Sequence, residues 1–146
     1  MIYRKSILQK IKFLRKSIDR TEAIITNNLK IIPSVLEGLN AISEGEILSN
    51  KEFSVRINVG ESRGSKVIMN MQKSGFIKLM KIFGDSRYKN IALTKSGIKL
   101  QKKADNILMR TEREIYKKVN AKEIEVFLKV CECINELLKE TENSED

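Results

Sequence analysis

The side chains with the most chemical capacity gather within residues 61–74 of this sequence. At 100° per residue, one side of a helix over this stretch carries hydroxyl, amide and cationic groups, together with one Met: Ser62, Arg63, Ser65, Lys66, Met69, Asn70 and Lys73. The opposite side is apolar, with Val67, Ile68 and Met71. Groups of the polar kind hydrogen-bond the base edges and phosphates of nucleic acids. A surface helix with one solvated side has the same pattern, so this stretch alone leaves both interpretations open.

The segment GDSRYKNIALTKSG, residues 84–97, holds a second group of polar side chains. Its first four residues have the composition of a hairpin turn, and they join two β-like runs, residues 77–83 and 88–93. Arg87 and Lys89 lie at the end of this turn and just beyond it. The segment therefore fits a hairpin whose tip contacts an acidic partner, and an enzyme loop could have the same composition.

The composition argues against most kinds of enzyme. The chain has no His, which removes the commonest metal ligand and the commonest general base. It has no Gly-rich phosphate loop, no G-x-S-x-G elbow and no C-x-x-C pair. Carboxylate-only chemistry stays open, but no clustered Asp/Glu pair suggests it. We therefore expect no catalytic residue, no metal site and no cofactor.

The charge is divided unevenly along the chain, whose formal net charge is +9. Residues 49–94 hold nine Lys/Arg and three Asp/Glu, a net of +6, whereas residues 119–146 hold three and eight, a net of −5. A basic middle favours a polyanionic partner, and nucleic acid is the usual one. A solvated Lys-rich surface would give the same count.

The length and hydropathy indicate one folded domain. The chain has 146 residues, of which 41% are hydrophobic and 32% charged, enough for a core and against disorder. No apolar run approaches the ~18 residues of a membrane span. The chain has two cysteines, and we identify no export signal in it, which together predict a cytoplasmic protein with reduced thiols.

A first helix is predicted over residues 2–28. Ile7, Ile11, Leu14 and Ile18 recur at steps of four, three and four, so they share one face. A basic amphipathic helix can lie on a membrane surface, but we favour packing against the body of the protein.

Local signals then place three short helices. Pro33 suits a helix start, and Ser49 with Glu52 forms an S-x-x-E capping box at the start of the next helix. The helix over 61–74 ends at Gly75. Two short helices around a Gly-containing turn fit a helix-turn-helix, and the hairpin that follows makes it a winged helix.

Two longer helices complete the chain. Thr94 is a good N-cap for a helix over residues 95–118, and a last helix is predicted from about 121 to 139. The last helix is apolar over a far wider arc than the ~100° of a surface helix, so we expect it to contact both its own chain and a second subunit. Cys131 and Cys133 point ~160° apart on it, which makes an internal disulfide implausible, and we expect both to be buried.

The order of these elements resembles the MarR family of bacterial transcription regulators. The likeness is most specific at Asp85-Ser86-Arg87, at Ile91-Ala92-Leu93-Thr94-Lys95-Ser96-Gly97, and at Lys73-Ser74-Gly75-Phe76-Ile77. It implies a mainly α fold with a small β-hairpin, in which a winged helix-turn-helix is flanked by N- and C-terminal dimerisation helices. The parts of this single MarR-like domain, 1–146, would be a DNA-binding part at about 33–94, dimerisation helices at about 2–28 and 95–140, and an acidic tail at 141–146.

This resemblance implies a homodimeric, sequence-specific regulator, acting as a repressor at a palindromic operator in double-stranded DNA. The eight candidate DNA-binding residues are then Ser62, Arg63, Ser65, Lys66, Asn70, Lys73, Arg87 and Lys89. Of these, Arg87, together with Lys89, would reach phosphates or a narrow A·T-rich minor groove, which attracts Arg. A small-molecule effector is left open, and no membrane partner is expected. The alternative is a winged-helix protein that acts through a protein partner without reading DNA.

Gly64 departs from the family pattern, in which a larger apolar residue is usual at this place. Because Gly inside a helix costs about 0.5–1 kcal/mol, we expect the helix over 61–74 to be mobile without DNA.

Overall fold

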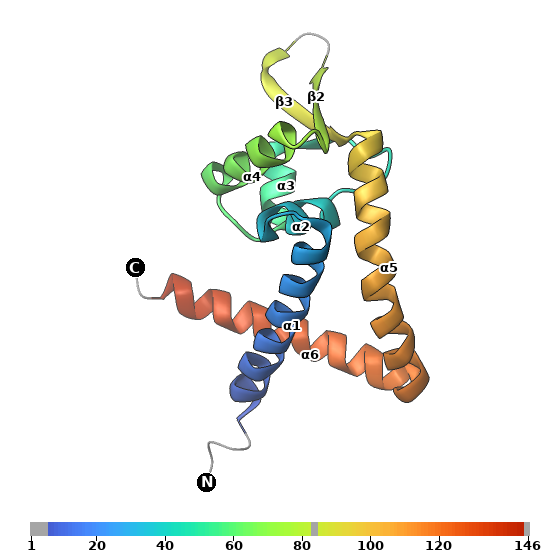
Figure 1. Cartoon of the computed structure of the whole chain (residues 1–146). Helices are drawn as coiled ribbons and strands as arrows, with labels where there is room; N and C mark the ends of the chain where they lie inside the picture. The colour runs from blue at the N-terminus through green and yellow to red at the C-terminus, as the bar shows by residue number, and fades with distance from the viewer. Residues whose placement is uncertain (1–5, 83–84, 145–146) are drawn as a thin grey trace. The chain divides into compact units, whose positions relative to one another are not determined.

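The computed structural model describes residues 6–82 and 85–144, and the side chains of 82–89 lie outside that description. The elements, in chain order, are α1 (Ile7–Leu29), α2 (Pro33–Asn40), β1 (Leu48–Ser49), α3 (Asn50–Arg56), α4 (Glu61–Lys73), β2 (Ile77–Ile82), β3 (Asp85–Leu93), α5 (Lys95–Lys118) and α6 (Ala121–Asn143) (Figure 1). The predicted fold class is confirmed, because a mainly α chain carries one small antiparallel sheet in a winged-helix order. The chain forms two compact units, residues 1–106 and 107–146.

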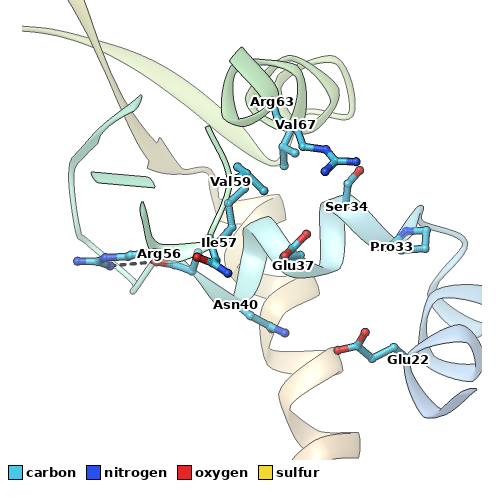
Figure 2. Close-up of a pocket in the computed structure, with 12 residues that line it drawn as sticks. Glu22, Pro33, Ser34, Glu37, Asn40, Arg56, Ile57, Val59, Arg63 and Val67 are labelled. Carbon is cyan, nitrogen blue, oxygen red and sulfur yellow. Dashed lines mark hydrogen bonds between the residues drawn. The ribbon is translucent and has the colours of Figure 1, made fainter. Parts of the chain in front are cut away.

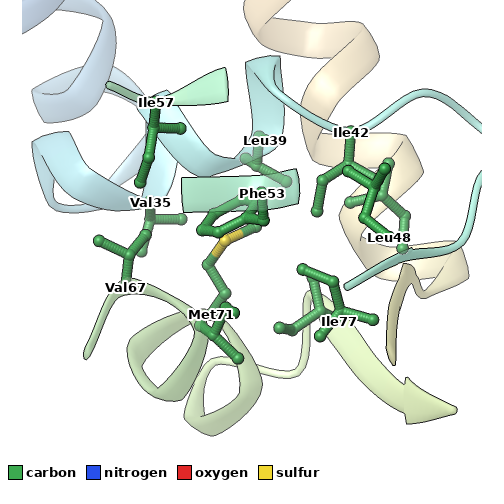
Figure 3. Close-up of a cluster of buried hydrophobic side chains, with 12 residues drawn as sticks. Val35, Leu39, Ile42, Leu48, Phe53, Ile57, Val67, Met71 and Ile77 are labelled. Carbon is green, nitrogen blue, oxygen red and sulfur yellow. The ribbon is translucent and has the colours of Figure 1, made fainter. Parts of the chain in front are cut away.

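The core of the first unit joins α2, α3 and α4 to the sheet. Phe53 of α3 is fully buried between Leu39 of α2 and Met71 of α4 (Figure 3). Ile77 of β2 and Ile91 of β3 extend the same cluster. Burial of such side chains contributes ~1.5–3 kcal/mol each, so this core fixes α4 relative to the sheet.

Side-chain caps predicted from the sequence begin α3 and α5. Ser49 Oγ accepts a hydrogen bond from the Glu52 N–H at 3.2 Å, and the Ser49 N–H donates to Glu52 Oε2 at 2.8 Å. Thr94 Oγ1 accepts from the Gly97 N–H at 3.1 Å and donates to the Gly75 carbonyl at 2.6 Å. Both predictions are confirmed, and Thr94 also joins the end of α4 to the start of α5.

The hairpin differs from the prediction in where its second strand begins. β3 starts at Asp85, so the predicted four-residue turn over 84–87 is wrong, and Arg87 lies in a strand. β2 and β3 pair in regular register as far as Lys81 and Lys89, after which Ile82 pairs with Asp85. Residues 86–88 are therefore extra on β3, as in a β-bulge, which lengthens this strand relative to β2. The part of the predicted turn at Gly84 lies outside the described residues.

A third strand was not expected. β1 has only two residues, and it pairs antiparallel with β3 through Leu48 and Ile91 and through Ser49 and Asn90. The sheet order is therefore β1-β3-β2, with β3 in the middle.

The apolar face of α1 is exposed. α1 begins at Ile7 after Ser6, and residues 2–5 of the predicted helix lie outside the description. Leu14 and Ile18 are 50% and 57% exposed, whereas the buried residues of α1 are Ile25 and Thr26, near its C-terminal end. The prediction that this face packs on the body of the same chain is therefore wrong for the chain by itself.

In the second unit, α6 is longer and more exposed than predicted. It continues to Asn143, three residues into the expected acidic tail. None of its residues is buried in the single chain, and both Cys131 and Cys133 are exposed free thiols. The single chain therefore does not bury the cysteines, and their burial against a second subunit stays a prediction. Over the described parts of the chain, no helix is long and apolar enough to cross a membrane.

The loop between α2 and β1 is tied to the end of α3 by an ion pair. Arg56 donates to both carboxylate oxygens of Glu46, at 2.5 and 2.7 Å, and to the Ala41 carbonyl at 2.9 Å. The Ser43 N–H also donates to Glu46, at 3.0 Å. The hydrogen bond from Arg56 comes first among the causes that lower the pKa of Glu46 from 4.5 to about 2.

Glu46→Gln is expected to lower the melting temperature at pH 7, because the folded state favours the ionised carboxylate. A lowered folded-state pKa stabilises the protein above the unfolded pKa, and this gain disappears as the pH falls from about 4.5 toward about 2. The difference between variant and parent should therefore shrink over that range, as followed by circular dichroism melts. Glu44→Gln is the matched control, because Glu44 of the same loop pairs with Lys102 of α5 and both side chains are exposed. A pH-independent difference for Glu46→Gln would contradict the assignment.

Candidate nucleic-acid interface

α4 lies across α3 (Figure 1), and Gly64 of α4 packs against Ser54 of α3. A Cβ atom on Gly64 would lie 1.9 Å from Ser54 Oγ and 2.9 Å from Ser54 Cβ. Gly64 and Ser54 are both buried. Gly64 therefore permits tight packing of α4 on α3, whereas the expected mobility of the helix without DNA stays a prediction.

The exposed side of α4 presents one ridge of side chains at steps of four, three and four residues. Its members are Ser62, Lys66, Met69 and Lys73, all of them exposed. Three of these were candidate residues, whereas Met69, which is 48% exposed, was left out of the predicted site. The exposed Gln72, beside Lys73, was also left out. Helical periodicity places Met69 on the polar side of the helix and Gln72 beside it, but Met69 was left out of the site because its side chain is apolar.

Ser65 lies at the edge of α4 that faces α3. Its hydroxyl accepts from Asn50 Nδ2 at 2.8 Å and donates to the Glu61 carbonyl at 2.9 Å. Asn50 also accepts from the Ser54 hydroxyl at 3.1 Å, so one amide links both helices. These bonds position α4, and they use the hydrogen that Ser65 would otherwise offer to a base or phosphate.

Arg63 and Asn70 lie at the opposite edge, nearer α2. Figure 2 shows Arg63 extending from α4 toward Ser34, beside a cavity of about 810 Å³. On another wall of this cavity is Glu22 of α1, whose pKa is raised by burial and then by the nearby charges of Asp19 and Glu37. Arg63 is exposed and Asn70 is half-buried, so both can be reached from outside.

The wing adds cations that the candidate set lacked. Lys78 and Lys81 of β2 are exposed. The predicted contacts Arg87 and Lys89 lie in β3, and their side chains are outside the part of the chain described here. The structure therefore brings Ser62, Lys66 and Lys73 together on α4 and leaves the relation of Arg87 and Lys89 to them a prediction.

The face formed by α4 and β2 is cationic. These two elements hold five Lys or Arg residues and one acid, Glu61. On the neighbouring α3, the carboxylate of Glu52 accepts from the Ser49 N–H and hydroxyl, and the backbone bond comes first among the causes that lower its pKa. Such a face attracts polyanions.

A protein metal site needs several ligating side chains close together. Among the described residues, no group of three or more His, Cys, Asp or Glu side chains is placed to hold a metal ion.

A helix-turn-helix of α3 and α4, followed by a β2–β3 wing, defines the class of winged-helix proteins. No family model matches the sequence, and no curated protein matches it either. Solved structures match it in fold. Staphylococcus aureus MepR bound to DNA is 17% identical with a TM-score of 0.76, over 90% of this chain and 98% of that chain.

Two further solved structures also match the fold of this chain. Escherichia coli MarR in its apo form is 15% identical with a TM-score of 0.67, over 88% of this chain and 96% of that one. NadR in complex with 4-hydroxyphenylacetate is 17% identical with a TM-score of 0.73, over 90% and 92%. The resemblance to MarR-family regulators predicted from the sequence is thus confirmed in the structural neighbours, and at these identities the likeness establishes the fold.

Proposed function

We propose that this chain is a transcription regulator that reads double-stranded DNA with α4. The observation that carries the proposal is the exposed ridge of α4, in which Lys66 and Lys73 stand on a helix locked to α3 at Gly64. An α-helix fits the major groove of B-DNA, and cations and small polar groups contact its phosphates and base edges. MepR, a neighbour in fold, has been solved with DNA, which supports the same use here.

The proposed DNA contacts divide by position. Ser62, Lys66 and Lys73 belong to the central ridge, so base edges and the nearest phosphates are their partners. Arg63 flanks this ridge on the side of α2, and Asn70 follows Arg63 two turns later along the helix. Arg87 and Lys89 of the wing contact phosphates or the minor groove. Ser65 contributes by holding α4 against Asn50.

The functional form is a homodimer acting as a repressor at a palindromic operator. Apolar side chains of α1 and α6, such as Leu14 and Leu137, are about half exposed in the single chain. Large exposed apolar areas mark interaction sites, and a two-fold dimer would bury them against their copies. The two copies of α4 would then read two half-sites roughly 10 bp apart, centre to centre.

Three further predictions accompany this proposal. The chain is not an enzyme, in line with neighbours that are transcription regulators. Its location is cytoplasmic.

A small-molecule effector is compatible with the cavity beside Arg63, whose volume lies within the ~300–1,000 Å³ range of ligand pockets. NadR has been solved with such a ligand, 4-hydroxyphenylacetate.

Capture of genomic DNA fragments on the immobilised protein, followed by sequencing, tests the proposed function. The expected result is enrichment of fragments that share one two-fold-symmetric motif. The alternative is a winged-helix protein that acts through a protein partner. Fragments with no shared motif, together with binding of a second protein to the immobilised chain, would favour it.

Asn70→Ala and Arg87→Ala are expected to impair DNA binding in different ways. Asn70→Ala should reduce discrimination between operator and random DNA, since a base contact is worth ~1–3 kcal/mol. Arg87→Ala should weaken both DNAs by similar factors, because a phosphate contact carries little sequence information. It should also lower the slope of log affinity against log salt by about one for each phosphate that the variant no longer neutralises. Anisotropy titrations over a range of salt check both, and an unchanged slope for Arg87→Ala would remove the wing from the interface.

A further inference from the structure

Met69 is an apolar side chain in the middle of a polar ridge. It is 48% exposed, whereas its neighbours on the same helix, Val67, Ile68 and Met71, are buried in the core. Its ridge neighbours are Ser62, Lys66 and Lys73, with Lys66 and Lys73 each one helical turn away. Core packing does not require an apolar side chain at this position. We therefore look for the role of Met69 in its contact with the partner that binds the ridge.

Apolar side chains make up the larger part of the lining of a hollow beside Met69. Met69 borders a hollow of about 250 Å³ between α4 and the sheet, together with Ile68, Leu79 and Ile91. Leu79 is half-buried and Ile91 is fully buried. Three polar side chains, Asn50, Ser65 and Gln72, also line the hollow, and Asn50 and Ser65 are hydrogen-bonded to each other. A partner group placed against Met69 here makes contact with the apolar atoms of Met69, Ile68 and Leu79.

We propose that Met69 recognises the 5-methyl group of a thymine in each half-site of the DNA, a proposal that rests on the proposed function. Among the base edges of the major groove, thymine alone presents an apolar group. A cytosine at the same place would set its amino group against a thioether that cannot accept a good hydrogen bond, and desolvation of that amino group is unfavourable. The unbranched Met side chain has three rotatable bonds, so it can adapt to the methyl group.

The role of Met69 differs from that of its neighbours. Lys66 and Lys73 attract DNA through charge, which varies little with sequence. Met69 adds no charge and makes its contribution only where a methyl group is present. It is therefore a residue that determines specificity.

Replacement of operator thymines by deoxyuridine tests this inference, because the change removes the methyl group and keeps the base pair. With the parent protein, one thymine in each half-site should respond, and removal of its methyl group should weaken binding about fourfold per half-site, or about fifteenfold for both. Met69→Ala should bind the thymine operator more weakly by a similar factor and should no longer respond to deoxyuridine at that position. Lys73→Ala is the control and should keep the response.

Met69→Gln provides a second variant that keeps the length of the side chain and supplies an amide. It should shift the preference at that position toward adenine, whose N6 and N7 a Gln amide pairs with. Specific binding without a thymine response, or a response that persists in Met69→Ala, would overturn the inference while leaving the proposed function in place. Absence of sequence-selective binding by the parent protein would instead count against both.

Discussion

Gly64→Ala is expected to lower the free energy of unfolding of the first unit by about 1–3 kcal/mol, the usual cost of an overpacked contact. The added Cβ would lie 1.9 Å from Ser54 Oγ, and Ser54 is held in place by its hydrogen bond to Asn50. Relief of this clash requires α4 to move away from α3. Because α4 carries the proposed base contacts, worth ~1–3 kcal/mol each, operator affinity should fall about tenfold or more.

Gly60→Ser is the matched control for this substitution. Gly60 is the N-cap of α4, and a Cβ there would meet no atom within 4 Å. Serine is also a favourable N-cap, so this variant should keep the parent stability or exceed it. Ser54→Gly in the Gly64→Ala background should recover part of the stability. Urea denaturation measures the stabilities, and a Gly64→Ala protein as stable as its parent would contradict the close-packing role of Gly64.

Leu137→Glu is expected to convert a dimer into a monomer. Leu137 is 56% exposed in the single chain and lies in an apolar arc of α6 that one neighbour cannot cover. A dimer would bury this side chain, and a buried unpaired carboxylate is strongly unfavourable. Light scattering at micromolar concentration should give about twice 16.8 kDa for the parent and about 16.8 kDa for the variant.

Lys129→Glu is the control for the dimer, because it introduces the same side chain in the polar sector of α6. This variant should keep the parent mass. The monomeric Leu137→Glu should also lose most of its operator affinity, since each chain then holds a single half-site. A parent protein whose mass by light scattering is that of a monomer would contradict the homodimer proposal.

The elements predicted well from the sequence are those whose signals are local. Pro33 occupies the first turn of α2, and Gly75 has a φ of 76° just after α4, a left-handed conformation that favours glycine. The capping box at Ser49 and the cap at Thr94 each span three residues. Such signals act within one helical turn, so a single sequence contains all that they require.

The elements missed from the sequence depend on distant partners. β1 has two residues, and its pairing with β3 across about forty positions is what makes it a strand. The Ser65 hydroxyl accepts a hydrogen bond from Asn50, fifteen residues away, whereas helical angles alone put that hydroxyl on the polar side. The apolar faces of α1 and α6 were assigned in part to the body of the same chain, whereas the single chain leaves them exposed.

Gly64 is a further residue whose role depends on a distant partner. Its low helix propensity is a local property, and it predicted a mobile helix. The contact with Ser54 of α3 is a tertiary property, and it makes the absence of a side chain a condition for tight packing. Propensity is a weak guide where a residue lies between two packed helices.

The central claim is that the chain distinguishes one DNA sequence from others through α4. Competition between the captured operator and a scrambled duplex of the same length and composition, at physiological salt, tests it most directly. The account predicts a preference for the operator of at least about 10³-fold, the lower range for specific DNA-binding proteins, and its reduction in Asn70→Ala. Equal affinity for the two duplexes would contradict the account.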